Sequence, residues 1–86
     1  MKQVFCLSDM RPGQRAVVQD LRSTGPMRRR LLDLGLIPET EVTCLGRSPG
    51  GDPAAYLIRG AVIAIRSGDS RDVLIQKPVG DAPTWA

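Results

Sequence analysis

The sequence from Met27 to Val42 reads Met-Arg-Arg-Arg-Leu-Leu-Asp-Leu-Gly-Leu-Ile-Pro-Glu-Thr-Glu-Val. Three of its apolar residues, Met27, Leu31 and Leu34, follow the spacing i, i+4 and i+7, which places them on one face of a helix. The charged residues between them fall on other faces. The stretch therefore predicts a short amphipathic helix that leads directly into a strand.

The ends of this helix carry specific start and stop signals. Pro26 suits the first helical position, where a missing N–H costs nothing, and Gly25 before it is an acceptable cap. Gly35 supplies a left-handed residue at the end, Leu36 can fold back onto the helix, and Pro38 prevents the helix from resuming. Function must therefore be sought around a single short helix.

The rest of the chain alternates short strand patterns with turn formers. Five segments combine apolar residues with the two-residue period of a strand or with a short apolar run. These segments are residues 14–21, 41–45, 55–59, 61–65 and 73–76. Leu7 to Met10 predicts a short helical turn, and Ser67 to Asp72 a capped single turn. Such short, regularly spaced strands favour a small closed antiparallel barrel with one short α-helix.

Two segments support more specific expectations. Ala61 to Ile65 is apolar on both faces, which is typical of a strand in the middle of a sheet. Ser48 to Pro53 holds five strong turn formers in six positions and predicts the most exposed and mobile loop. Residues 78–86 lack periodicity, so we expect a flexible C-terminal tail after a domain of residues 1–77.

Composition limits the function. The 86 residues predict one domain, the net charge of +3 is mild, and no apolar run approaches a membrane span of about 18 residues. The N-terminus lacks the apolar stretch of a signal peptide, so we expect a cytoplasmic chain. Cys6 and Cys44 have no Cys-x-x-Cys spacing and predict reduced thiols, with Cys44 in the core.

Four separated motifs resemble the FeoA family of ferrous iron transport proteins. They are Leu7 to Gly13, Met27 to Val42, Gly51 to Pro53, and Arg59-Gly60, in order and at compatible distances over about residues 6–76. One position departs from the family pattern, because Glu39 stands where a glycine is often found after the proline. The resemblance implies an SH3-like barrel and a cytosolic accessory role in iron homeostasis beside FeoB, the iron permease with a cytosolic GTP-binding domain.

The predicted partner-binding residues lie outside the apolar stripe. They are Arg28, Arg29, Ser48, Pro49, Gly50, Gly51, Asp52 and Pro53. Two guanidinium groups and an adaptable loop suit contact with an acidic protein partner. The plainer interpretation is a solvated helix face in which Arg29 and Arg30 reach Asp33.

A second functional class is a small nucleic-acid-associated barrel. Such a role usually adds stacking aromatic side chains to a strongly basic groove, yet the sequence has only Phe5, Tyr56 and Trp85, scattered along the chain. We therefore expect no nucleic-acid partner. The resemblance extends to the C-terminal module of some iron-dependent repressors, but the sequence shows no helix-turn-helix pattern, so we expect no repressor role.

The sequence gives little basis for catalysis or a bound cofactor. It has no histidine to activate a serine and no Gly-x-x-x-x-Gly-Lys phosphate loop, so we expect neither an enzyme nor a cofactor. Glu39 and Glu41 would share one side of a strand as a paired carboxylate. Cys6 beside a carboxylate could hold an adventitious ion. These residues do not by themselves define a metal site.

Overall fold

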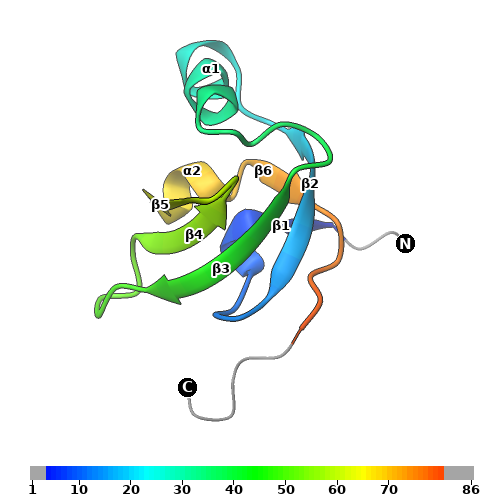
Figure 1. Ribbon diagram of the computed structural model, residues 1–86. Coiled ribbons are helices and arrows are strands. Elements are labelled where there is room, and N and C mark those ends of the chain that lie inside the picture. The colour runs from blue at the N-terminus through cyan, green and yellow to red at the C-terminus, as the bar shows by residue number, and fades with distance from the viewer. Residues whose placement is uncertain (1–3, 81–86) are drawn as a thin grey trace.

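The computed structural model describes residues 4–80, which form a small antiparallel barrel with a helix across one end (Figure 1). The elements follow the chain in this order: β1 (Phe5–Cys6), the 3-10 turn η1 (Leu7–Asp9), β2 (Arg15–Leu21), α1 (Gly25–Asp33), β3 (Glu41–Arg47), β4 (Ala54–Ile58), β5 (Ala61–Ile65), α2 (Ser67–Ser70) and β6 (Val73–Ile75). The mainly-β architecture with one short helix is confirmed, and α2 is the predicted single turn.

The described residues contain six strands where the sequence predicted five. The extra strand is β1, whose two residues pair antiparallel with β6 through Phe5–Ile75 and Cys6–Leu74. The strand order is β1-β6-β2-β3-β4-β5. Two residues are too few to show a period, which explains why β1 was not predicted.

The expectation that residues 61–65 form a central strand is wrong. β5 pairs only with β4 and stands at one edge of the sheet. Ala61, Val62 and Ala64 are exposed, and Val62 retains 67% of its accessible surface. An apolar run on both faces is therefore no guarantee of two neighbouring strands, because the pattern is equally compatible with an uncovered edge.

The core is formed by the inward faces of the strands. The fully buried residues include Val42 and Cys44 on β3, as their period of two predicts. Tyr56 on β4 lies at the centre, is fully buried, and donates a hydrogen bond from its hydroxyl to the Leu7 carbonyl oxygen at 3.3 Å. This bond satisfies the buried phenol and attaches η1 to the barrel.

Helix α1 ends as its sequence predicts. The N–H of Leu36 donates to the carbonyl oxygen of Leu31 at 3.1 Å, and the N–H of Gly35 donates to that of Leu32 at 2.9 Å. This pair of bonds is a Schellman motif, with Gly35 in the left-handed region at φ 102°. Leu31 and Leu36 are both buried, so the motif also fastens α1 to the core.

The start of α1 differs from prediction by one position. The helix includes Gly25, and its N-cap is Thr24, whose side chain makes no capping hydrogen bond. Pro26 lies in the first turn as expected. Met27, Leu32 and Leu34 are partly buried against the core, so the apolar face of the helix is the inner one.

The segment after β6 contacts the barrel again at Val79. Val79 and Arg15 exchange two backbone hydrogen bonds, at 2.9 Å and 2.8 Å. Residues 81–86 of the expected tail lie outside the described residues, so the division into residues 1–77 and 78–86 stays a prediction. Within the described part of the chain, neither the length nor the hydropathy of any helix suffices to cross a membrane.

Candidate partner-binding surface

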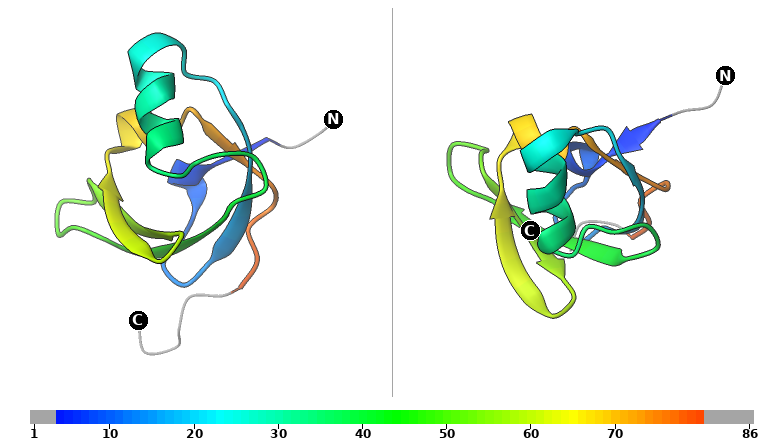
Figure 2. Two further views of the ribbon diagram at one scale, coloured as in Figure 1. Left: turned by 45° about the horizontal axis from the view of Figure 1, so that its top comes forward. Right: turned by 90° about the horizontal axis from the view of Figure 1, so that it is seen from above.

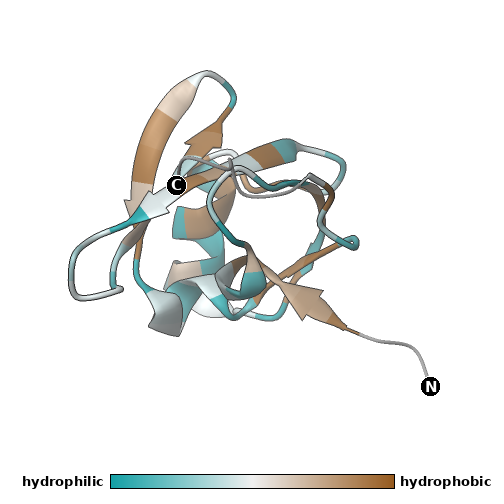
Figure 3. Cartoon of the chain, turned by 90° about the horizontal axis from the view of Figure 1, so that it is seen from below, coloured by the Kyte–Doolittle hydropathy of each residue, from teal (hydrophilic) through white to brown (hydrophobic). Residues whose placement is uncertain are grey.

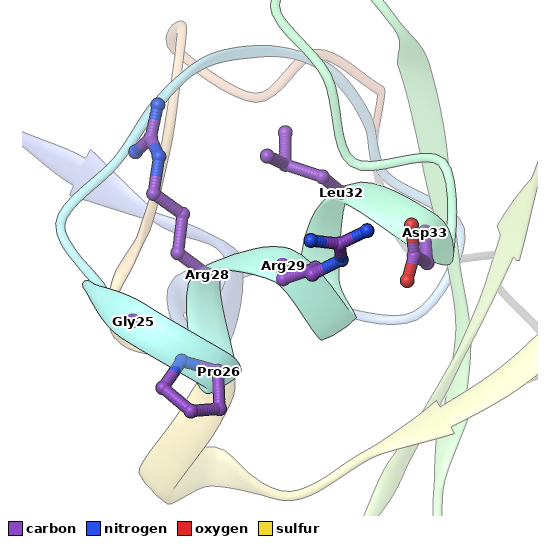
Figure 4. Close-up of a pocket in the computed structure, with 6 residues that line it drawn as sticks. All are labelled: Gly25, Pro26, Arg28, Arg29, Leu32 and Asp33. Carbon is purple, nitrogen blue, oxygen red and sulfur yellow. The ribbon is translucent and has the colours of Figure 1, made fainter.

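The outer side of α1 carries an open hollow of about 730 Å³, and both predicted arginines of the helix line it (Figure 4). Its other lining residues are Gly25, Pro26, Leu32 and Asp33. Arg28 and Arg29 are exposed and Leu32 is half-buried. An apolar side chain beside two guanidinium groups resembles the mixed composition of a protein interface.

The two arginines differ in what they already contact. Arg28 donates from Nη1 to the carbonyl oxygen of Leu21 at 3.1 Å, so it ties the end of β2 to α1. Figure 4 shows Arg29 extending along the helix in the direction of Asp33, although residues 4–80 include no hydrogen bond between them. Arg28 therefore has a structural contact that the sequence did not reveal, and Arg29 is the freer charge.

The loop from Ser48 to Pro53 is more tightly held than its composition suggests. The N–H of Ser48 donates to the Pro53 carbonyl oxygen at 3.0 Å, and the N–H of Gly51 donates to the Ser48 carbonyl oxygen at 2.7 Å. Of the six loop residues, Pro49, Gly50 and Asp52 are exposed and the other three are half-buried. These bonds close the loop on itself at both ends.

Asp52 has a role that sequence reasoning missed. Its carboxylate accepts from the N–H of Ser67 at 2.8 Å and from the Ser67 hydroxyl at 3.2 Å. The N-cap residue of α2 is Arg66, and its side chain makes no capping hydrogen bond. Because the acceptor comes from a residue fifteen positions earlier, no local signal could have identified it. Asp52 therefore holds the loop against α2.

The structure does not gather the predicted residues into one surface. Figures 1 and 2 show α1 at one end of the barrel and the β3–β4 loop projecting from its side. Only Pro53 approaches the helix, and it does so in a groove that it shares with Met27 and Arg30. Arg28 and Arg29 face the separate hollow. The predicted partner-binding residues therefore lie on two separate surfaces, one on α1 and one on the β3–β4 loop.

Neither proposed metal arrangement assembles a ligand cluster. Cys6 contacts Asp9 through its thiol at 3.2 Å and its N–H at 3.0 Å, which makes a local cap of η1. Glu39 lies in a turn and Glu41 begins β3, so they do not share a strand. Among residues 4–80, no group of three or more His, Cys, Asp or Glu side chains converges.

Two titratable groups in the core are perturbed by burial. Desolvation raises the pKa of the Cys44 thiol, and it raises the pKa of the Tyr56 phenol. Burial therefore favours the neutral form of both groups, and the Cys44 thiol is fully buried, unlike the accessible thiol of a reactive cysteine. They contribute to the core and lie apart from the candidate surface.

The fold and the surface define a class of protein, a small SH3-like barrel. Its surface carries a hollow on the outer side of α1 and exposed strand faces. The SH3-like fold is confirmed by the zinc-complexed FeoA of Stenotrophomonas maltophilia, described as an SH3 domain protein. It shares 25% identity with this chain at a TM-score of 0.76, over 84% of this chain and 89% of that one. Helix α1 and the β3–β4 loop are thus parts of an SH3-like scaffold.

The chain belongs to the FeoA family, because the FeoA domain model matches residues 5–77. The FeoA-like protein of Clostridium acetobutylicum is 26% identical over 88% of both chains, at a TM-score of 0.79. FeoA of Chlorobium tepidum is 29% identical over 93% of this chain and 76% of that one, at a TM-score of 0.80. No curated protein matches the sequence. The family supports an accessory role in ferrous iron transport.

A manganese-dependent transcriptional repressor shares the fold at 16% identity and a TM-score of 0.78. This chain corresponds to 43% of that repressor's length. At this identity the likeness concerns the fold alone and carries no function to this chain.

Proposed function

We propose that this chain is a non-catalytic accessory protein of bacterial ferrous iron uptake, acting in the cytosol by binding the cytosolic region of a FeoB-type permease. The observation that carries the proposal is the FeoA domain match over residues 5–77, which includes every strand and helix of the described barrel. The Stenotrophomonas maltophilia relative is described as a candidate ferrous iron transport activating factor. The barrel would act as the binding module.

The hollow on α1 supports a contact with an acidic partner. Arg29 is exposed beside the half-buried Leu32, and Arg28 lies on the same hollow. Charged groups at the rim of an interface mainly steer association, whereas an apolar centre limits dissociation. We therefore assign Arg28 and Arg29 to the encounter with the permease.

Surface plasmon resonance with the purified cytosolic region of the permease tests this function. The wild-type chain should bind, and the double variant Arg28→Glu/Arg29→Glu should associate about tenfold more slowly at low salt, with the difference shrinking at high salt. The matched control is Arg11→Glu/Arg71→Glu, which changes the net charge equally at two exposed sites elsewhere.

No binding by the wild-type chain would refute the proposed function. Equal slowing by both double variants would show that only net charge matters and would remove the assignment of Arg28 and Arg29. Calorimetry with GTP and GDP tests the non-catalytic part separately. We expect no heat of binding, and a reproducible micromolar dissociation constant would contradict that expectation.

The nucleic-acid alternative gains no supporting observation. Tyr56 is fully buried and Phe5 is half-buried against the core, so neither offers a free stacking face within residues 4–80. Trp85 lies outside the described residues. Steep salt dependence of binding to single-stranded oligonucleotides would revive this alternative.

A further inference from the structure

The two edges of the sheet are very different. β1 at one edge has two residues, and short edge strands of this kind resist unwanted pairing. β5 at the other edge has five, Ala-Val-Ile-Ala-Ile, with no charge, proline or bulge among them. Proteins usually protect long apolar edges with such devices. β5 lacks them, so it suits pairing with another strand, and its C-terminal end, from Ala64 to Arg66, shares a groove with α1.

The register shows which backbone groups β5 offers. Ile58 and Ala61 flank the two-residue turn Arg59-Gly60, and residues in that position exchange hydrogen bonds. Because bonding alternates along an antiparallel pair, the N–H and C=O groups of Val62 and Ala64 point away from β4. Among residues 4–80 they have no backbone partner on that side. The edge therefore presents two donors and two acceptors in register.

The outward side chains of the β4–β5 hairpin are apolar. Val62 lies opposite Leu57 on β4, and these residues keep 67% and 37% of their surface exposed. Figure 3 shows the hairpin as a hydrophobic ribbon that projects from the side of the barrel. Side chains at alternate positions of an added strand would lie beside Val62 on this face and so bury part of its apolar surface.

Charge distinguishes between possible occupants of this edge. Exposed arginines flank β5 at both ends, Arg59 before it and Arg66 after it. Near Arg66, a groove of about 270 Å³ between α1 and the end of β5 is lined by Ala64 and Arg30, with Asp69 as its one acidic lining residue. A second copy paired antiparallel about Ile63 would bring Arg66 beside the Arg59-Gly60 turn, and like charges there oppose self-pairing.

We propose that the outer edge of β5 is a strand-addition site for an extended segment of a protein partner that alternates apolar residues and is acidic at its ends. Val62 and Ala64 supply the backbone bonds, Val62 also supplies the apolar contact, and Arg66 with Arg30 supplies the charge complement. The inference rests on the proposed function, because the partner is taken to be the permease. It places the contact that limits dissociation on β5, apart from Arg28 and Arg29.

The first test removes a backbone donor while retaining the fold. Ala64→Pro deletes an N–H that points away from β4, a position where an edge strand tolerates proline. It should weaken binding of the permease's cytosolic region at least about tenfold, chiefly by faster dissociation. Ala64→Ser keeps the N–H and is the matched control. Val62→Lys, which places a charge on the edge, provides a second variant if Ala64→Pro unfolds.

The second test uses hydrogen exchange in the unmutated chain. The amides of Val62 and Ala64 should exchange fast in the free protein and at least about tenfold more slowly in the complex. Arg66→Gln should weaken binding severalfold. Arg71 is also exposed but caps the C-terminal end of α2, so Arg71→Gln should leave binding unchanged.

The outcomes separate this inference from the function on which it rests. If the wild-type chain binds and Ala64→Pro and Val62→Lys, both folded, bind equally well, the strand-addition site is wrong while the proposed function stands. Protection of Val62 and Ala64 that grows with concentration of the free chain would overturn it in favour of a second copy. If the wild-type chain fails to bind, both proposals fall.

Discussion

Gly35 at the end of α1 lies directly against Arg59 in the turn between β4 and β5. A Cβ atom built on Gly35 would come within 3.0 Å of Arg59 Cδ and 3.2 Å of Ile58 Cγ2, closer than side-chain atoms normally approach. The helix stop and the β4–β5 turn, which are 24 positions apart, therefore meet at a residue that has no side chain. Two of the motifs that resemble the FeoA family thus form one contact.

Gly35→Ala should destabilise the protein by ~1–3 kcal/mol, because the new Cβ is strained at φ 102° and meets Arg59 and Ile58. Urea unfolding gives the free energy. Gly50→Ala is the matched control, since it has open space around it and an ordinary φ, and it should change the midpoint little. Equal midpoints for Gly35→Ala and the wild type would show that the contact is loose.

Glu39→Gly should stabilise the protein by up to ~1 kcal/mol. Glu39 adopts φ 75°, where glycine is free of strain, and it stands where the family pattern often has glycine. Glu41→Gly is the comparison, because Glu41 begins β3 with ordinary strand geometry. This variant should lower the free energy of unfolding by up to ~1 kcal/mol. A lower urea midpoint for Glu39→Gly than for the wild type would mean that the Glu39 side chain makes a contact whose stabilisation exceeds the backbone strain.

Leu31→Ala should cost ~2–5 kcal/mol, since its side chain is 1% exposed and joins α1 to the core. In a domain of this size that loss approaches the whole stability. Leu32→Ala, at a half-buried neighbouring position, should cost less than half as much. Comparable effects of the two truncations in denaturant unfolding would contradict the packing of α1 described above.

Stability should decrease at alkaline pH. Burial raises the pKa of the Cys44 thiol above its ordinary value of 9.0 and that of the Tyr56 phenol above 10.0. The native state therefore retains protons that the unfolded chain releases, so the stabilisation is complete below pH 9 and is lost as pH rises through the raised values. Urea midpoints from pH 7 to pH 10.5 measure this loss.

Cys44→Ala supplies the control for the alkaline effect. It removes one of the two titrating groups, so the decline in its midpoint with pH should be shallower than that of the wild type, although its stability at pH 7 is lower. A wild-type midpoint that stays constant up to pH 10.5 would show that neither group is desolvated as described.

Local chemistry in the sequence was sufficient for α1 and for most strands. The spacing of Met27, Leu31 and Leu34, the proline at the start and Gly35 at the end act within a few residues, so they determine the helix wherever it packs. The alternation of Val42 and Cys44 likewise assigned the inner face of β3. The unusual Glu39, noted from sequence, proved to have the positive φ that glycine would favour.

Only the tertiary structure decided where each element stands and which polar groups meet. An apolar segment such as Ala61 to Ile65 has the same pattern at the centre of a sheet and at an uncovered edge, because the number of neighbouring strands depends on chain topology. The bonds from Ser67 to Asp52 and from Arg28 to Leu21 join separate elements. Sequence patterns describe the periodicity within one segment, so they do not determine such long-range pairings. The shape of the candidate surface depends on these pairings and was therefore not predictable either.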